Sequence, residues 1–157
     1  MAVEPPKPGD VVPYWYLWHH EANRGQEEGV KPRPCLVVRR LTNEQHQTKL
    51  FIVPITTRPP SEQTPAIEVP AQTQNRLGLE GKRSWIITNE VNSFTWIGPD
   101  MDRTRSGTYT YGAMPAGLVR AVQRNIIALN QHQQVKVTLR DEVKDIARQM
   151  KDLSQDN

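Results

Sequence analysis

The sequence predicts a single, mainly β domain that ends in α-helices and forms a small barrel or sandwich. Short runs of β-branched and aromatic residues recur through the first 113 residues without helical patterns between them. An apolar repeat at spacings of three and four begins only after Pro115. At 157 residues the chain has the length of one domain with its own core. We therefore expect one domain with terminal additions, rather than a doubly wound sheet.

The N-terminal region predicts an arm, a strand and a loop. Residues 1–8 contain three prolines, which fix the backbone and favour an extended arm. Residues 11–17 predict the first strand, with Pro13 at an edge or a bulge. Residues 19–32 are polar and charged and predict a long loop. Long loops in compact domains are uncommon unless they are functional or disordered, and both readings apply here.

Five further runs have the β-branched and apolar content of strands. They lie at residues 35–38, 50–55 and 84–91, with weaker ones at 67–69 and 106–111. Most of the first 113 residues are therefore expected to be β.

Two helices are predicted after this region. Pro115 suits the first position of a helix. One apolar face then follows, made of Leu118, Val119, Val122, Ile126 and Leu129. A second helix is predicted from Leu139 to about Leu153, with Thr138 and Asp141 as a start that resembles a capping box. The expected organisation is an arm over 1–8, the main domain over 9–130, and an additional amphipathic helix within 131–157.

Composition narrows the classes of function. The chain has 20 basic and 17 acidic residues, and the net charge of +3 favours a polyanionic partner. Cys35 is the single cysteine and is expected to be a small buried hydrophobe, and the four histidines lack zinc-site spacing, so we expect no structural metal. No signal peptide and no run of ~20 apolar residues is present, so a cytoplasmic protein without a membrane partner is expected.

Four motifs occur in order along residues 9–130. They are Gly9-Asp10 at the start of a strand, RPCLVV from Arg33, PITT from Pro54, and the helix from Pro115. Together they resemble the MazF/PemK/Kid family of toxins. This resemblance implies an SH3-like, partly open β-barrel that forms a homodimer. It also implies a metal-independent endoribonuclease without a cofactor, which cleaves single-stranded RNA and is restrained by a cognate antitoxin.

RNA cleavage without a metal needs a base, an acid and a cation around the scissile phosphate. Arg33 is the predicted cation, because the planar guanidinium forms two hydrogen bonds with a phosphate. The resemblance also places the arginine at this position in the active site. The alternative is that Arg33 pairs with a loop carboxylate and only anchors its strand.

The predicted proton carriers lie in the loop before Arg33. The resemblance places a glutamate shortly before this arginine, which makes Glu27 or Glu28 catalytic, and a one-residue insertion leaves the choice open. Both residues are otherwise solvated loop charges. His20, next to His19, is an alternative acid, because histidine titrates closest to neutral pH.

Five other residues are predicted to bind substrate. Thr56 and Thr57 would bind phosphate or ribose through their hydroxyl groups, or would instead cap a turn. Asn89 and Glu90 fall in the fifth strand, where Ile87 and Asn89 replace the arginine and aspartate of the Kid-like branch, and Glu90 replaces a frequent glutamine. Trp15, in a run with Tyr14, Tyr16 and Trp18, would stack on a base or pack in the core.

Two other functions remain as alternatives. The missing charged pair at Ile87 and Asn89 suits a barrel that binds nucleic acid or protein without cleavage. A CcdB-like gyrase inhibitor would share the fold, although the chain ends in SQDN and lacks the tryptophan-bearing helix end of those toxins. An antitoxin is expected to dock as an extended acidic segment over the basic groove.

Overall fold

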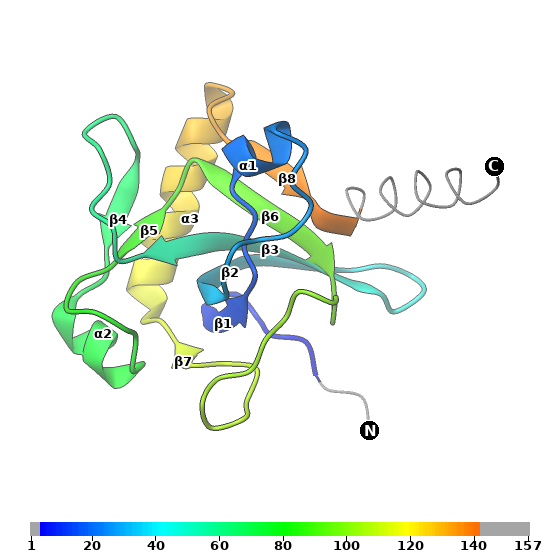
Figure 1. Ribbon diagram of the computed structural model, residues 1–157, viewed down its shortest axis with the longest axis horizontal. Helices are drawn as coiled ribbons and strands as arrows, with labels where there is room; N and C mark the ends of the chain where they lie inside the picture. Colours follow the sequence, from blue (N-terminus) through cyan, green and yellow to red (C-terminus); the bar gives the residue numbers. More distant parts are fainter. Residues whose placement is uncertain (1–3, 142–157) are drawn as a thin grey trace.

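The computed structural model describes residues 4–141 (Figure 1). The strands are β1 Asp10–Tyr14, β2 Arg33–Thr42, β3 Thr48–Thr56, β4 Ala66–Glu68, β5 Trp85–Ile87, β6 Glu90–Thr95, β7 Gly112–Ala113 and β8 Lys136–Leu139. The helices are α1 His19–Asn23, α2 Ala71–Arg76 and α3 Ala116–Gln131. The fold class is thus mainly β with a helix near the C-terminal end.

The strands form one sheet that is mainly antiparallel. Its order is β4-β5-β3-β2-β1-β7, while β6 pairs with the first half of β3 and β8 lies parallel to β6. Among the described strands, β4 and β7 end this path and do not pair with each other, so the sheet is not closed into a barrel. A long β2–β3 pair, with a bulge between Val37 and Arg39, forms the centre of the sheet.

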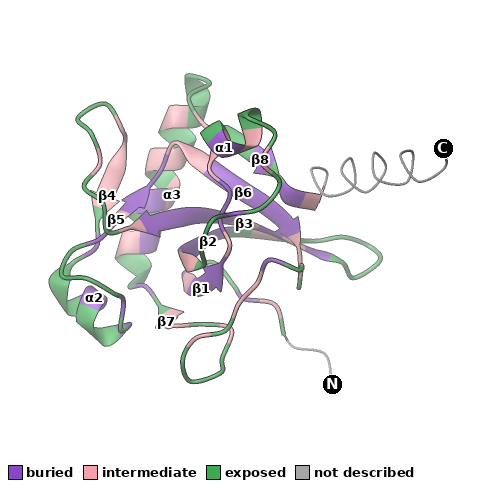
Figure 2. Ribbon diagram, viewed as in Figure 1, coloured by how far each residue is buried: buried purple, intermediate pink, exposed green. Residues whose placement is uncertain are grey.

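The sheet buries both of its faces. Strand alternation sends Val11 and Leu36 to one face and Val12 and Cys35 to the other. The first face packs against α3 through Val119 and Val122, so the predicted apolar face of this helix covers the sheet (Figures 1 and 2). The second face packs under the segment that follows β1. Burial raises the pKa of the Cys35 thiol, as expected for a small buried hydrophobe.

Three predicted strands, at 35–38, 50–55 and 67–69, are confirmed. The strand predicted over 11–17 is shorter than expected. Residues 35–38 and 50–55 lie within β2 and β3, and residues 67–68 lie in β4. β1 ends at Tyr14 because the N–H of Tyr16 donates to the carbonyl of Tyr14, 2.9 Å away, which turns the chain. Pro13 pairs with Pro34 within the sheet.

The loop predicted over 19–32 contains a helix. α1 begins directly after Trp18, whose N–H donates to Glu21 Oε1 at 3.0 Å. The side chain of Glu21 is buried, and Gln26 donates to its other oxygen at 3.3 Å. A carboxylate thus satisfies the start of this short helix, and only the residues after Asn23 are irregular.

Two other predicted strands are wrong in part. Residues 84–91 do not form one strand, because Thr88 turns aside: its N–H donates to the Pro65 carbonyl and its hydroxyl donates to Asn125. The chain therefore divides into β5 and β6. Residues 106–111 form hydrogen-bonded turns around Thr104 and Thr108, and only the two residues of β7 pair with β1.

The C-terminal prediction is also corrected at its start. Leu139 is the last residue of β8 and not the first turn of a helix. Asp141 does not cap a helix with Thr138; its Oδ2 accepts from the N–H and the hydroxyl of Thr95, at 3.0 and 2.7 Å. Helical conformation begins one residue later, at Arg140 and Asp141, and the rest of the predicted helix, from residue 142 to Leu153, lies outside the described residues.

Candidate functional site

A groove of about 590 Å³ opens where the start of β2, the end of β3 and the loop before β7 meet. Its charged lining residues are Lys31, Arg33, Glu80, Asp102, Arg103 and Arg105. Four of these six are basic, so the groove favours an anionic ligand. The groove is also lined by three prolines, whose rings restrict the backbone there: Pro13, Pro32 and Pro34.

Arg33 is the first residue of β2, and its half-buried side chain lines the groove. Its guanidinium carbon lies 5.0 Å from the centroid of the Trp18 ring. Within residues 4–141, the Nε of Arg33 is buried without a hydrogen-bond partner, and no ion pair involves this residue. The anchoring salt bridge considered above is therefore not formed in the described part of the chain, and the guanidinium is available to a phosphate.

The two threonines that end the third strand have different surroundings. The hydroxyl of Thr56 accepts from the N–H of Arg58 at 3.1 Å, which is the turn-capping role. Thr57 is exposed and lines the same groove as Arg33. Of the two hydroxyl groups, that of Thr57 is the one positioned to meet a ligand in the groove.

Trp18 brings several predicted residues together. The His20 ring stacks on it, with centroids 6.5 Å apart and planes inclined by 23°. The Tyr16 ring meets it edge-on at 5.3 Å, and Arg33 lies over it as described. We call these four residues the Trp18 cluster. His20 is exposed, so the cluster joins a solvated imidazole to the groove arginine through one indole.

Glu90 is hydrogen-bonded to the cluster through Tyr16. Its Oε1 accepts from the Tyr16 hydroxyl and from the His19 N–H, each at 3.1 Å. Burial raises the pKa of Glu90, and these two hydrogen bonds and the charges of His20 and Lys136 reduce the shift. Glu90 therefore holds the start of α1 and the Tyr16 ring in place.

The family comparison decides what kind of protein this geometry belongs to. The model of the family described as "PemK-like, MazF-like toxin of type II toxin-antitoxin system" matches residues 7–129. The chain belongs to this family of type II toxins. The match includes the whole Trp18 cluster and the groove, and it ends before β8. No curated protein matches the chain. As a type II toxin, the protein has a cognate antitoxin as its partner.

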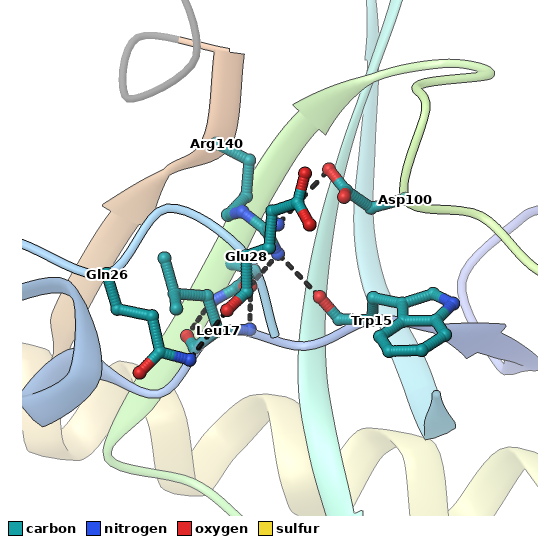
Figure 3. A network of polar contacts seen from close by, with 7 residues as sticks. Trp15, Leu17, Gln26, Glu28, Asp100 and Arg140 are labelled. Atoms are coloured by element: carbon teal, nitrogen blue, oxygen red, sulfur yellow. Dashed lines mark hydrogen bonds and ion pairs between the residues drawn. The ribbon is translucent and has the colours of Figure 1, made fainter. Parts of the chain in front are cut away.

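In this PemK/MazF-like toxin the two predicted catalytic glutamates do not line the groove that Arg33 lines. Glu27 and Glu28 are exposed and form no ion pair with Arg33. The carbonyl of Glu28 accepts from Gln26 at 2.6 Å, which shapes the loop (Figure 3). Their role in proton transfer stays a prediction.

Three predicted substrate-binding residues of the toxin lie outside the groove. The carbonyl of Asn89 accepts from the N–H of Lys136 at the start of β8, and Glu90 binds Tyr16 and His19. The Trp15 carbonyl is bound by Arg140, and its indole extends away from that contact (Figure 3). Their contact with substrate stays a prediction.

The structure adds residues to the toxin's site that the sequence reading did not select. Arg103 and Arg105 line the groove, and Arg103 is held by Tyr109, whose hydroxyl lies 3.2 Å from its Nη2. The run MDRTR, a basic pair next to turn residues, was the available signal. Glu21, which accepts from the Trp18 N–H at the start of α1, was also not selected. Its position three residues after Trp18 was the available signal.

The described residues contain neither a candidate metal site nor a candidate membrane-spanning helix. No group of three or more histidine, cysteine or acidic residues within 4–141 is placed to hold a metal ion. No helix in the same range is long and apolar enough to cross a membrane.

Proposed function

We propose that this toxin is an endoribonuclease that cleaves single-stranded RNA by attack of the 2′-hydroxyl on the adjacent phosphate, without a metal. The observation that carries the proposal is the half-buried guanidinium of Arg33, which lines a basic groove and forms no ion pair within residues 4–141. The predicted homodimer and the SH3-like, partly open barrel belong to the same proposal and rest on the family resemblance.

In this mechanism Arg33 binds the non-bridging phosphate oxygens as negative charge develops on them. The Thr57 hydroxyl, which lines the same groove, donates to the same phosphate. The 2′-oxygen forms a bond to phosphorus after losing its proton to a base. The bond to the 5′-oxygen breaks, and this oxygen takes a proton from an acid. The products end in a 2′,3′-cyclic phosphate and a 5′-hydroxyl.

The two proton carriers come from the loop over 19–32 in this proposal. Glu27 or Glu28 is the base, since a carboxylate can accept the proton of the 2′-hydroxyl. His20 is the acid, and its stacking on Trp18 supports this role because the same indole contacts Arg33. Closure of the loop onto bound RNA would bring the carboxylate to the phosphate.

To test this proposal, the purified protein is incubated with a long unstructured RNA in EDTA, and the new ends of the RNA products are identified. Cyclic phosphate ends with the wild type, and intact RNA with Arg33→Ala, are expected. Arg33→Lys keeps the charge but loses the planar fork, so it should retain only a small part of the activity. Arg120→Ala, an exposed arginine on α3, is the matched control and should cleave normally.

A second candidate function is RNA binding without cleavage. It is favoured by Ile87, which is buried in β5 where the Kid-like branch has an arginine, and by Asn89, which lies outside the groove. Under this alternative the wild-type protein leaves RNA intact and retains it in a gel-shift assay that weakens with salt. The antitoxin, in either case, is proposed to cover the basic groove with an extended acidic segment.

A further inference from the structure

We propose that Arg140 is a positioning residue for the site, which fixes the backbone leading into Trp18 and, through Trp18, the guanidinium of Arg33. Arg140 directly follows β8 and lies outside the family match over 7–129. The consequence for catalysis rests on the proposed function, whereas the structural link to Arg33 does not.

Arg140 connects three segments of the chain at one buried point. Its side chain is 1% exposed, and Nη1 donates to the Trp15 carbonyl at 2.7 Å and to Asn92 Oδ1 at 3.1 Å (Figure 3). Nη2 lies 3.1 Å from Asp100 Oδ2, and the guanidinium carbon lies 5.3 Å from the Tyr14 ring centroid. A buried charge is retained only when paired and hydrogen-bonded, so these groups hold each other in place.

The hydrogen bonds continue from Arg140 toward the site. Asn92 Oδ1, which accepts from Arg140, also accepts from the Leu17 N–H at 2.9 Å. Asn92 Nδ2 donates to the Leu17 carbonyl at 2.8 Å, so Leu17 is fixed at both its backbone groups. Trp18 is the next residue, and Arg33 lies over its ring. From Arg140 to Arg33, each step is a direct contact.

The position of β8 explains why this arginine can act there. β8 pairs with β6 in parallel, and Asn92 of β6 lies opposite Thr138 of β8. Arg140 follows two residues later and enters the core beside the same strand. β8 therefore delivers the cation that faces both the Asp100 carboxylate and the carbonyl of Trp15 in the core.

The experiment measures the link to Arg33 directly, by the NMR signal of the Arg33 Nε–H. Its place over the Trp18 ring gives this signal a ring-current shift. Arg83 lies equally at 5.0 Å over Trp85, at a site formed by β4 and β5, and is the internal reference. In Arg140→Lys the ammonium cannot reach all three partners, so we expect the Arg33 signal to move while the Arg83 signal stays.

Cleavage kinetics give the second measurement. With an RNA that contains a single cleavable site, Arg140→Lys should lower kcat on the order of 10-fold to 100-fold, with a smaller change in KM, because Arg33 is displaced from its working geometry. Arg120→Lys on α3 is the matched control for the same substitution at an exposed position and should change neither the signals nor the kinetics.

The outcomes separate this inference from the proposed function. An unchanged Arg33 signal in a folded Arg140→Lys variant, as judged by the Arg83 signal, would overturn the inference whatever the activity. A displaced Arg33 signal in a protein that cleaves no RNA would support the inference and reject the nuclease. If Arg140→Lys does not fold, Asp100→Asn tests the inference instead. The asparagine amide oxygen can still accept a hydrogen bond, but the substitution removes the ion pair with Arg140. The same displacement of the Arg33 signal is expected.

Discussion

At the scale of single residues, the site depends on how Arg33 is presented. A guanidinium on a flexible chain would lose side-chain entropy of about 2 kcal/mol on binding a phosphate. Stacking over Trp18 orders it beforehand and contributes about 0.5–2 kcal/mol of its own. Because no ion pair within 4–141 uses the charge and only Nε is buried, this ordering leaves the two terminal nitrogens of the guanidinium to the ligand. The Trp18 indole thus orders the Arg33 guanidinium, the cation that the proposed reaction needs.

Glu90 provides a prediction of stability against pH. Its pKa is raised in the folded protein, mainly by burial, so the folded state binds this proton more tightly than the unfolded state. The free energy of unfolding should therefore fall as pH rises from about 4.3 through the raised pKa. Glu90→Gln should lose this decline and keep the hydrogen bonds from Tyr16 and His19.

Urea unfolding measured at several pH values tests this. Glu62→Gln removes an exposed carboxylate, so its curve corrects for the change in net charge. If the wild type and Glu90→Gln lose stability in parallel across this range, the burial of Glu90 does not control the titration.

At the scale of elements, the contact of β7 with the end of α2 depends on Gly112. This residue has φ of +122°, and a Cβ placed there would lie 2.9 Å from a methyl carbon of Leu77. Gly112→Ala should therefore lower the free energy of unfolding by about 1–3 kcal/mol. Gly117, in the first turn of α3, has no atom within 4 Å of such a Cβ.

Gly117→Ala is accordingly the matched control, and it should raise the free energy of unfolding by about 0.5–1 kcal/mol because alanine favours a helix. Denaturant titration of both variants is the measurement. Equal effects of the two substitutions would show that the conformation of Gly112 is not required for β7 to pair with β1.

Local patterns predicted the elements whose structure is decided locally. The β-branched runs at 50–55 and the apolar spacing within α3 are such cases. The break at Thr88 was not predictable, because it is made by Pro65 and Asn125, which lie far away in sequence. The residues around Leu139 have a pattern that suits either a helix or a strand. Leu139 lies in a strand because it pairs with Ser93 of β6.

The residues of the candidate site also divide into those that local patterns predicted and those that only the folded chain brings together. Arg33 and Thr57 were predicted from motifs and lie in one groove. The contact of Trp18 with both Arg33 and His20, and the approach of Arg103 to the groove, arise only when distant segments fold together. The assignment of Glu27 and Glu28 came from position relative to the arginine, which fixes neither the direction nor the reach of a side chain on an irregular loop.

At the scale of the whole molecule, the small net charge of +3 conceals an uneven distribution. Four basic residues meet at the groove: Lys31 just before β2, Arg33 at its start, and Arg103 and Arg105 from the loop before β7. Glu80 and Asp102 also line the groove, so its six charged residues carry a net charge of 4 − 2 = +2, against +3 for the whole chain. The electrostatic attraction for RNA is therefore expected to be local, and to fall with salt in proportion to the number of groove cations that contact phosphate.

This distribution gives a quantitative prediction for Arg103 and Arg105. Binding of a 2′-O-methyl oligonucleotide, which has no free 2′-hydroxyl for attack, would be measured by fluorescence anisotropy at several salt concentrations. For a single strand, the slope of log affinity against log salt is about −0.7 per phosphate contact, so replacing both residues with alanine should flatten it by about 1.4. Arg120→Ala with Arg124→Ala removes the same charge from the exposed side of α3 and should leave the slope unchanged. Equal flattening by both pairs would mean that RNA responds to total charge and not to this groove.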